Sequence, residues 1–90
     1  MTTAALATTR ILVADDERAI AQAAVRRLER EGASCDAVYT GQDALARLAE
    51  EPWDLVLCDL VLPGNSGAEI LAAALARDDA PVVLVVASEG

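Results

Sequence analysis

Three aspartates follow two short apolar runs in this chain. Residues 11–14 lead directly into Asp15 and Asp16, and residues 55–58 lead into Asp59. Apolar runs of this length are typical of strands buried on both faces of a parallel sheet, whose carboxyl ends meet along one edge where ligands bind. If the two strands are neighbours, the three carboxylates lie close together and repel one another unless a cation joins them. Oxygen ligands suit a hard divalent cation, and we expect Mg²⁺.

The elements that would hold these aspartates alternate regularly along the chain. Strand patterns and amphipathic helical patterns follow one another, with Gly32 ending the first helix, Thr40 capping the second and Pro52 following its end. The alternation predicts one parallel sheet with right-handed crossovers. The predicted strands are residues 11–14, 33–39, 55–58 and 82–86, and the predicted helices are residues 18–31, 40–51 and 68–77.

Side-chain spacing on the helices gives more detailed expectations. In the second helix, Asp43 and Arg47 have the i, i+4 spacing of an exposed ion pair. Trp53 follows that helix, and we expect it to pack as a hydrophobic lid beneath it. The third helix should turn four apolar residues inward. These residues are Ile70, Leu71, Ala74 and Leu75.

Composition limits the class of protein. Ninety residues make one small domain, and the net charge of −8 argues against direct binding to nucleic acid or to an acidic membrane. No apolar run approaches the length of a membrane span, and residues 1–9 are expected to be a flexible leader. Cys35 and Cys58 lack metal-site spacing and are expected to be reduced thiols. We therefore expect a cytoplasmic protein.

The order of these motifs resembles the receiver domain of two-component response regulators. The matching features are an aspartate pair after the first strand, the run from Thr40, a Pro and a Gly four and eight residues after Asp59, and the strand after Pro81. The resemblance covers residues 10–90. It implies an α/β, flavodoxin-like, doubly wound parallel sheet in three layers (α/β/α). Helix 4, strand 5 and helix 5 would be absent, leaving a receiver-like domain at 10–90 that is incomplete at its C-terminus.

The resemblance also implies a role for each acidic residue. Asp59 would be the phosphoacceptor, taking the phosphoryl group from a histidine kinase or phosphotransfer protein. Asp16 would bind Mg²⁺ directly, Asp15 would bind it through water, and the carbonyl oxygen of Val61 would be a further ligand. Phosphoryl transfer depends mainly on positioning and charge neutralisation, which such a metal supplies. The chain would be a signalling domain and not an enzyme, because the transfer is to its own side chain.

Two departures from the family pattern leave other interpretations open. The sequence contains no Lys, although the family has one at the end of a fifth strand, and Val86 stands where the family has a hydroxyl residue. A degenerate receiver that binds partners without phosphorylation is therefore an alternative. A phosphohydrolase of the haloacid-dehalogenase type also uses an aspartate after a strand, but it needs an Asp-x-Asp pair that this chain lacks.

The fourth predicted strand also suggests a partner. Residues 82–86 are wholly aliphatic, and an apolar strand at an open sheet edge favours pairing with another chain. We therefore expect a homodimer that covers this edge.

Overall fold

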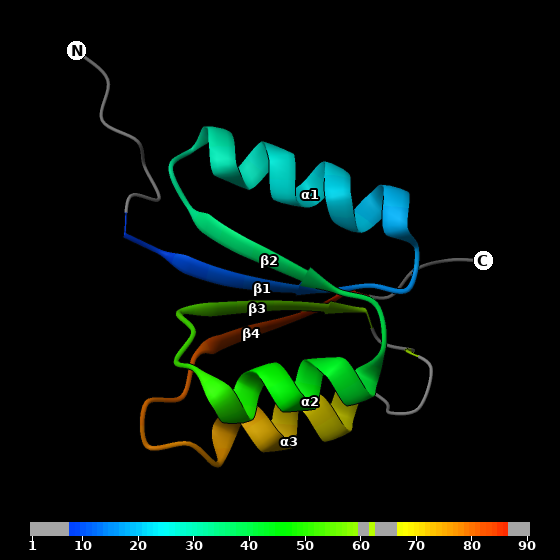
Figure 1. Cartoon of the computed structure of the whole chain (residues 1–90). Helices are drawn as coiled ribbons and strands as arrows, with labels where there is room; N and C mark the ends of the chain where they lie inside the picture. The colour runs from blue at the N-terminus through cyan, green and yellow to red at the C-terminus, as the bar shows by residue number, and fades with distance from the viewer. Residues whose placement is uncertain (1–7, 60–61, 63–66, 87–90) are drawn as a thin grey trace.

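The computed structural model describes residues 8–59, 62 and 67–86, which form a four-stranded parallel sheet with three helices (Figure 1). The strands lie in the order β2-β1-β3-β4. The strands are β1 (Arg10–Ala14), β2 (Ser34–Val38), β3 (Leu55–Asp59) and β4 (Val82–Val86), and the helices are α1 (Arg18–Arg30), α2 (Gly41–Glu50) and α3 (Gly67–Leu75).

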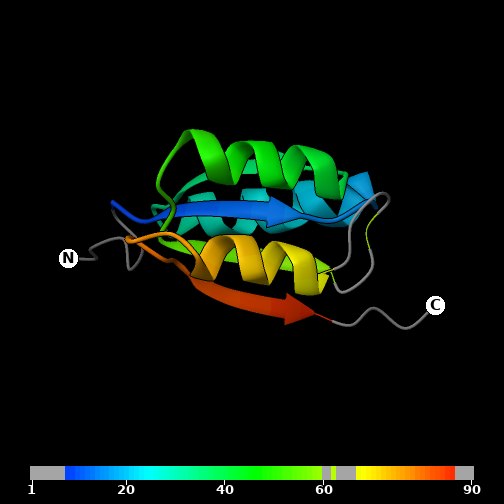
Figure 2. The same cartoon turned by 90° about the horizontal axis from the view of Figure 1, so that it is seen from below.

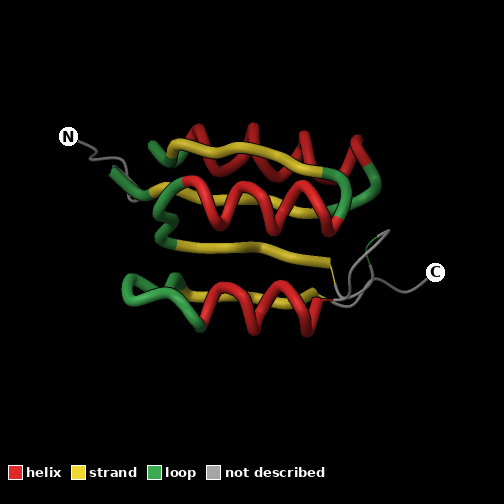
Figure 3. The backbone as a smooth tube through the Cα atoms, turned by 60° about the horizontal axis from the view of Figure 1, so that its bottom comes forward, coloured by secondary structure: helices red, strands yellow, loops and turns green. Residues whose placement is uncertain are grey.

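The helices cover both faces of the sheet. Helix α1 lies on one face, while α2 and α3 lie side by side on the other (Figures 1 and 2). A hydrophobic core lies on each face of the sheet, and alternate residues of β1 belong to each. Ile11 and Val13 pack with Ala21 of α1, and Leu12 and Ala14 pack on the α2 and α3 side. The predicted flavodoxin-like, doubly wound fold in three layers is confirmed, and the described part of it ends with β4 (Figure 3).

Local sequence signals set the helix ends as expected. The Thr40 hydroxyl accepts a hydrogen bond of 3.1 Å from the Asp43 backbone N–H, which satisfies one of the exposed donors at the start of α2. Gly32, just after α1, has φ of 101°, a left-handed conformation that costs glycine little. The chain can therefore reverse from α1 into β2 within a few residues.

Trp53 packs beneath α2 as predicted. Its side chain is 4% exposed and belongs to the core on that face of the sheet. The indole N–H donates a hydrogen bond of 3.1 Å to the Arg47 carbonyl oxygen, and the Arg10 guanidinium lies 4.6 Å from the ring centroid. Trp53 therefore ties the end of α2 to the start of β1.

The predicted ion pair between Asp43 and Arg47 is not the one that forms. Arg47 pairs with Asp36 of β2 and with Glu51, at 2.9 Å in the second case. Asp43 sits in the first turn of α2, where its backbone N–H donates to Thr40, whereas Arg47 pairs with one carboxylate on the sheet, Asp36, and with Glu51 at the end of α2. Hydrogen bonds from Arg10 and Arg47 lower the pKa of Glu51.

The prediction for the inner face of α3 is wrong for one of its four residues. Ile70 and Ala74 are buried, whereas Leu75 is 59% exposed. Ile70 and Ala74 lie one helical turn apart, on the face of α3 that contacts the sheet. Leu75 is the residue after Ala74, so its side chain is turned away from that face. No described helix or strand covers Leu75 on that side.

Strand β4 forms one margin of the described sheet, as the sequence predicted (Figure 2). It pairs with β3 in parallel, and its side chains on the α1 side are Val82, Leu84 and Val86. All three are exposed, because α1 covers the β1 and β2 part of that face.

None of the described helices is long and apolar enough to cross a membrane.

Candidate functional site

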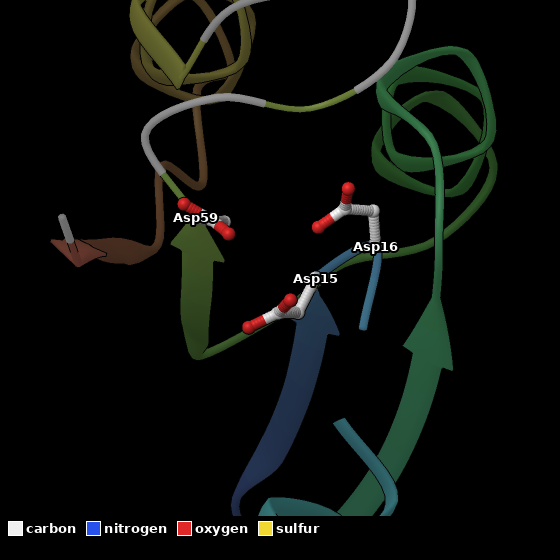
Figure 4. A group of neighbouring side chains, drawn as sticks. All are labelled: Asp15, Asp16 and Asp59. Carbon is white, nitrogen blue, oxygen red and sulfur yellow. The ribbon is translucent and has the colours of Figure 1, made fainter. Parts of the chain in front are cut away.

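The three predicted aspartates come together at the carboxyl edge of the sheet. One carboxylate oxygen from each of Asp15, Asp16 and Asp59 lies within 4.8 Å of the others. Figure 4 shows the side chains around a common space beyond the ends of β1 and β3. The expectation that β1 and β3 are neighbours, on which this prediction depended, is confirmed by their parallel pairing.

Backbone hydrogen bonds hold the two strand ends in place. The Asp15 N–H donates to the Val38 carbonyl oxygen at 3.1 Å, which extends the pairing of β1 with β2 by one residue. The Glu17 N–H donates to one carboxylate oxygen of Asp15 at 2.9 Å, and α1 begins at the next residue. Ala14 lies opposite Cys58 in the register, so the next residue of each strand is an aspartate. The strand pairing therefore fixes the positions of Asp15 and Asp59 relative to one another.

Burial differs across the three carboxylates. Asp59 is 6% exposed, Asp15 is partly buried, and Asp16 is exposed to solvent. The pKa of the neighbouring Cys58 thiol is raised to about 11. Burial is the largest cause, and the negative charges of Asp59 and Asp15 raise it further. The site is thus negative, closed on the Asp59 side and open on the Asp16 side.

This donor set fits a hard divalent cation. All three side chains offer carboxylate oxygens, and repulsion between them is relieved when a cation binds. Mg²⁺ keeps several water ligands, which a site open at Asp16 can accommodate. One Asp15 oxygen accepts a hydrogen bond from the Glu17 N–H, and Asp15 also contributes a carboxylate oxygen to the cluster.

The remaining predicted residues have different outcomes. Val61, the predicted carbonyl ligand, lies outside the described residues, as do Pro63 and residues 1–7 of the predicted leader. Gly67 is the first residue of α3. Val86 is the last residue of β4 and lies opposite Asp59 in the register, which confirms the predicted end of the fourth strand.

One neighbour of the site was not predicted from the sequence. The Arg18 guanidinium lies 4.0 Å from the centroid of the Tyr39 ring, an arrangement typical of a cation–π contact. Arg18 is the first residue of α1 and Tyr39 follows β2. They meet only because β2 lies next to β1, so no spacing along the chain indicated this contact.

Sequence comparison identifies similar proteins. A sequence model described as the response regulator receiver domain matches residues 11–90. Sensory transduction protein RegX3 of Mycolicibacterium smegmatis is 36% identical over 81 residues, which are 90% of this chain and 36% of RegX3. The chain therefore spans little more than a third of the length of that relative.

Two solved structures with a similar fold contain bound ligands or a modified residue. Response regulator TrrA of Thermotoga maritima, in complex with Mg²⁺ and BeF, is 29% identical with a TM-score of 0.83, over 91% of this chain and 71% of TrrA. A response regulator of Burkholderia pseudomallei, with a phosphorylated aspartic acid, calcium ion and citrate, is 26% identical with a TM-score of 0.80. That match covers 91% of this chain and 48% of the Burkholderia protein.

Proposed function

We propose, from the premise that this chain belongs to the family of two-component response regulator receiver domains, that Asp59 accepts a phosphoryl group beside a bound Mg²⁺. The donor would be a phosphohistidine of a histidine kinase or phosphotransfer protein. The observation that carries the proposal is the convergence of Asp15, Asp16 and Asp59 within 4.8 Å. The family match also favours this chemistry over that of a haloacid-dehalogenase phosphohydrolase.

In the proposed transfer, the carboxylate of Asp59 accepts the phosphoryl group. An oxygen of Asp59 forms a bond to phosphorus while the P–N bond of the phosphohistidine breaks. The bonding electrons go to the imidazole nitrogen, which takes a proton from water, and Asp59 becomes an acyl phosphate. Bound Mg²⁺ would neutralise charge on the phosphoryl oxygens and on the carboxylates. Because the group ends on Asp59 itself, the chain acts as an acceptor and not as a turnover enzyme.

In the proposed mechanism each aspartate has a separate task. Asp59 is buried at the end of β3, paired in register with Val86 of β4, and it would be the attacking carboxylate. Asp16 is exposed and would bind the metal directly from the solvent side, while Asp15 would hold it through water. The carbonyl of Val61 remains a predicted ligand. The TrrA structure with Mg²⁺ and BeF and the Burkholderia structure with a phosphorylated aspartic acid support phosphorylation beside a metal ion by analogy.

Direct phosphorylation tests this proposal without the cognate kinase. The chain would be incubated with phosphoramidate and MgCl₂, and its intact mass would be measured. We expect a gain of one phosphoryl group that depends on Mg²⁺, is lost in Asp59→Asn and is strongly reduced in Asp16→Ala. Glu29→Gln, which removes one exposed negative charge from α1, serves as the matched control and should be phosphorylated normally. Phosphorylation of Asp59→Asn at the normal rate would refute the assignment.

The degenerate receiver remains a second candidate because of the residue beside Asp59. Val86 lies in register with Asp59, and its side chain cannot donate a hydrogen bond to a phosphoryl oxygen. If neither phosphoramidate nor Mg²⁺ with beryllium fluoride acts on the protein, while its partner binding is unchanged by Asp59→Asn, this second function is supported instead. In either case we expect a cytoplasmic protein without direct contact to nucleic acid.

A further inference from the structure

Arg18 is the one arginine of the described residues that lies at the carboxyl edge of the sheet. A helix that follows a parallel strand begins at this edge and runs back toward the other one, so Arg18, the first residue of α1, stands beside the aspartate cluster. The other arginines lie at the start of β1, in the second half of α1 or α2, or after α3; they are Arg10, Arg26, Arg27, Arg30, Arg47 and Arg77. Arg18 is therefore the arginine that the negative charge of the cluster attracts most strongly.

Arg18 does not pair with the acidic residues that precede it. Asp15, Asp16 and Glu17 are its neighbours along the chain, and side chains three positions apart in a helical turn are close enough to meet. In the part of the chain that the structure describes, however, the ion pairs involve arginines at the other edge of the sheet and none involves Arg18. The Arg18 guanidinium lies instead 4.0 Å from the centroid of the Tyr39 ring. The ring therefore holds a cation for which nearby carboxylates compete.

Tyr39 is fixed in place by the sheet and by the core. The Asp15 N–H donates to the Val38 carbonyl oxygen at 3.1 Å, so Tyr39 directly follows the residue of β2 that is bonded to the aspartate pair. Its ring is partly buried and packs against the core between α1 and the sheet. Arg18 is exposed. The contact therefore consists of an exposed cation on the face of an anchored ring.

We propose that Tyr39 is a positioning residue that holds the Arg18 guanidinium away from Asp15 and Asp16, so that their carboxylates stay available to a divalent cation. Exposed cation–π contacts and exposed ion pairs have similar strengths, so removal of the ring lets Arg18 turn to the carboxylates. A guanidinium paired there occupies the oxygens that a hard cation requires. The inference rests on the Mg²⁺ site of the proposed function and adds to it two residues outside the ligand set.

Titration of the ¹⁵N-labelled whole chain with MgCl₂, followed by NMR, tests the proposal. Tyr39→Leu keeps an apolar side chain against the core and removes the ring. It should raise the Kd for Mg²⁺ roughly two- to fivefold, which is the preference that one exposed cation–π contact supplies. Tyr39→Phe keeps the ring and should restore the wild-type Kd. Circular dichroism would verify that both variants are folded.

A double variant separates this role from a purely structural one. If Tyr39 acts through Arg18, Tyr39→Leu should leave the Kd for Mg²⁺ unchanged in an Arg18→Gln background. An equal rise in Kd with and without Arg18 would mean that Tyr39→Leu only loosens the start of α1, and it would overturn the proposal. Arg27→Gln is the matched control, because it removes another exposed arginine of α1, and in that background Tyr39→Leu should keep its full effect.

The side-chain resonance of Arg18 provides a readout that needs no metal. In EDTA, the ring current of the aromatic side chain should shift the Arg18 Nε–H signal upfield in the wild type and in Tyr39→Phe, and the shift should be lost in Tyr39→Leu. An unchanged Nε–H signal, or equal Mg²⁺ affinity of the wild type and Tyr39→Leu, would overturn this inference and leave the proposed function intact. Failure of the wild type to bind Mg²⁺ would refute the proposed function, and the inference with it.

Discussion

Replacing Asp59 with asparagine should stabilise the metal-free fold and abolish its stabilisation by Mg²⁺. Asp59 is buried within 4.8 Å of two other carboxylates at their nearest oxygens, so its charge is held in place against repulsion. Asparagine has nearly the same shape without the charge. The substitution therefore removes two of the three repulsions in the cluster while leaving the packing at the end of β3 unchanged.

The size of the effect follows from that distance. Two unit charges 4.8 Å apart repel by about 0.9 kcal/mol in water and by about 3.5 kcal/mol at an effective dielectric constant of about 20. Asp16 is exposed, so its pair with Asp59 belongs near the lower value, and the partly buried Asp15 belongs between the two. Adding the two repulsions, we expect Asp59→Asn to raise the free energy of unfolding by about 2–4 kcal/mol without metal, with a rise in Tm of roughly 4–8 °C per kcal/mol.

Thermal denaturation followed by circular dichroism measures this change. At low salt with EDTA, Asp59→Asn should melt above the wild type. Each tenfold excess of Mg²⁺ over its Kd should add about 1.4 kcal/mol to the wild type and much less to the variant. Glu29→Gln removes the same charge from an exposed site on α1 and is the control for net charge.

Two results would refute this reasoning. If Asp59→Asn melts at or below the wild type in EDTA, repulsion in the cluster is not the main consequence of that charge. If Mg²⁺ raises the Tm of both proteins equally, the stabilising cation does not bind at Asp59. Equal behaviour of Asp59→Asn and Glu29→Gln would assign the effect to net charge.

Three further predictions concern the rest of the molecule. Trp53→Ala should lower the free energy of unfolding by about 3–5 kcal/mol in urea denaturation followed by circular dichroism, since the buried ring and its bond to Arg47 are lost. Unchanged stability would contradict that role. Arg10 and Arg47 lower the pKa of Glu51, so its contribution is present above the ordinary glutamate pKa and is lost as pH falls through the lowered value. The Tm difference between wild type and Glu51→Gln should therefore be largest near neutral pH and should decrease as the pH falls below the ordinary glutamate pKa of about 4.3; a pH-independent difference would oppose this. The Cys58 pKa of about 11 leaves about one thiolate in a thousand at pH 8, so iodoacetamide should modify Cys58 far more slowly in the folded than in the urea-unfolded protein, as mass spectrometry would show. Equal rates would contradict the burial of this thiol.

The order of elements and the position of the site could be predicted from the sequence because both depend on local patterns. Apolar runs, helical spacing and caps such as Thr40 are determined by residues close together in the chain. The carboxyl ends of parallel strands share one edge, so aspartates that end two strands had a predictable meeting place once β1 and β3 were taken as neighbours. The end of the fourth strand at Val86 was also predicted, whereas its register opposite Asp59 came from the structure.

Side-chain partners could not be predicted this way, because they depend on which elements become neighbours in space. Arg47 has an acceptable partner four residues away in Asp43, yet it binds Asp36 on a strand placed beside it by the sheet order. The contact of Arg18 with Tyr39 and the exposure of Leu75 have the same origin. The sequence by itself determined the kinds of elements and the chemistry at their ends. Only the tertiary structure decided which long side chains meet. Several possible partners lie within reach of each such side chain along the sequence, and packing across the sheet selects among them.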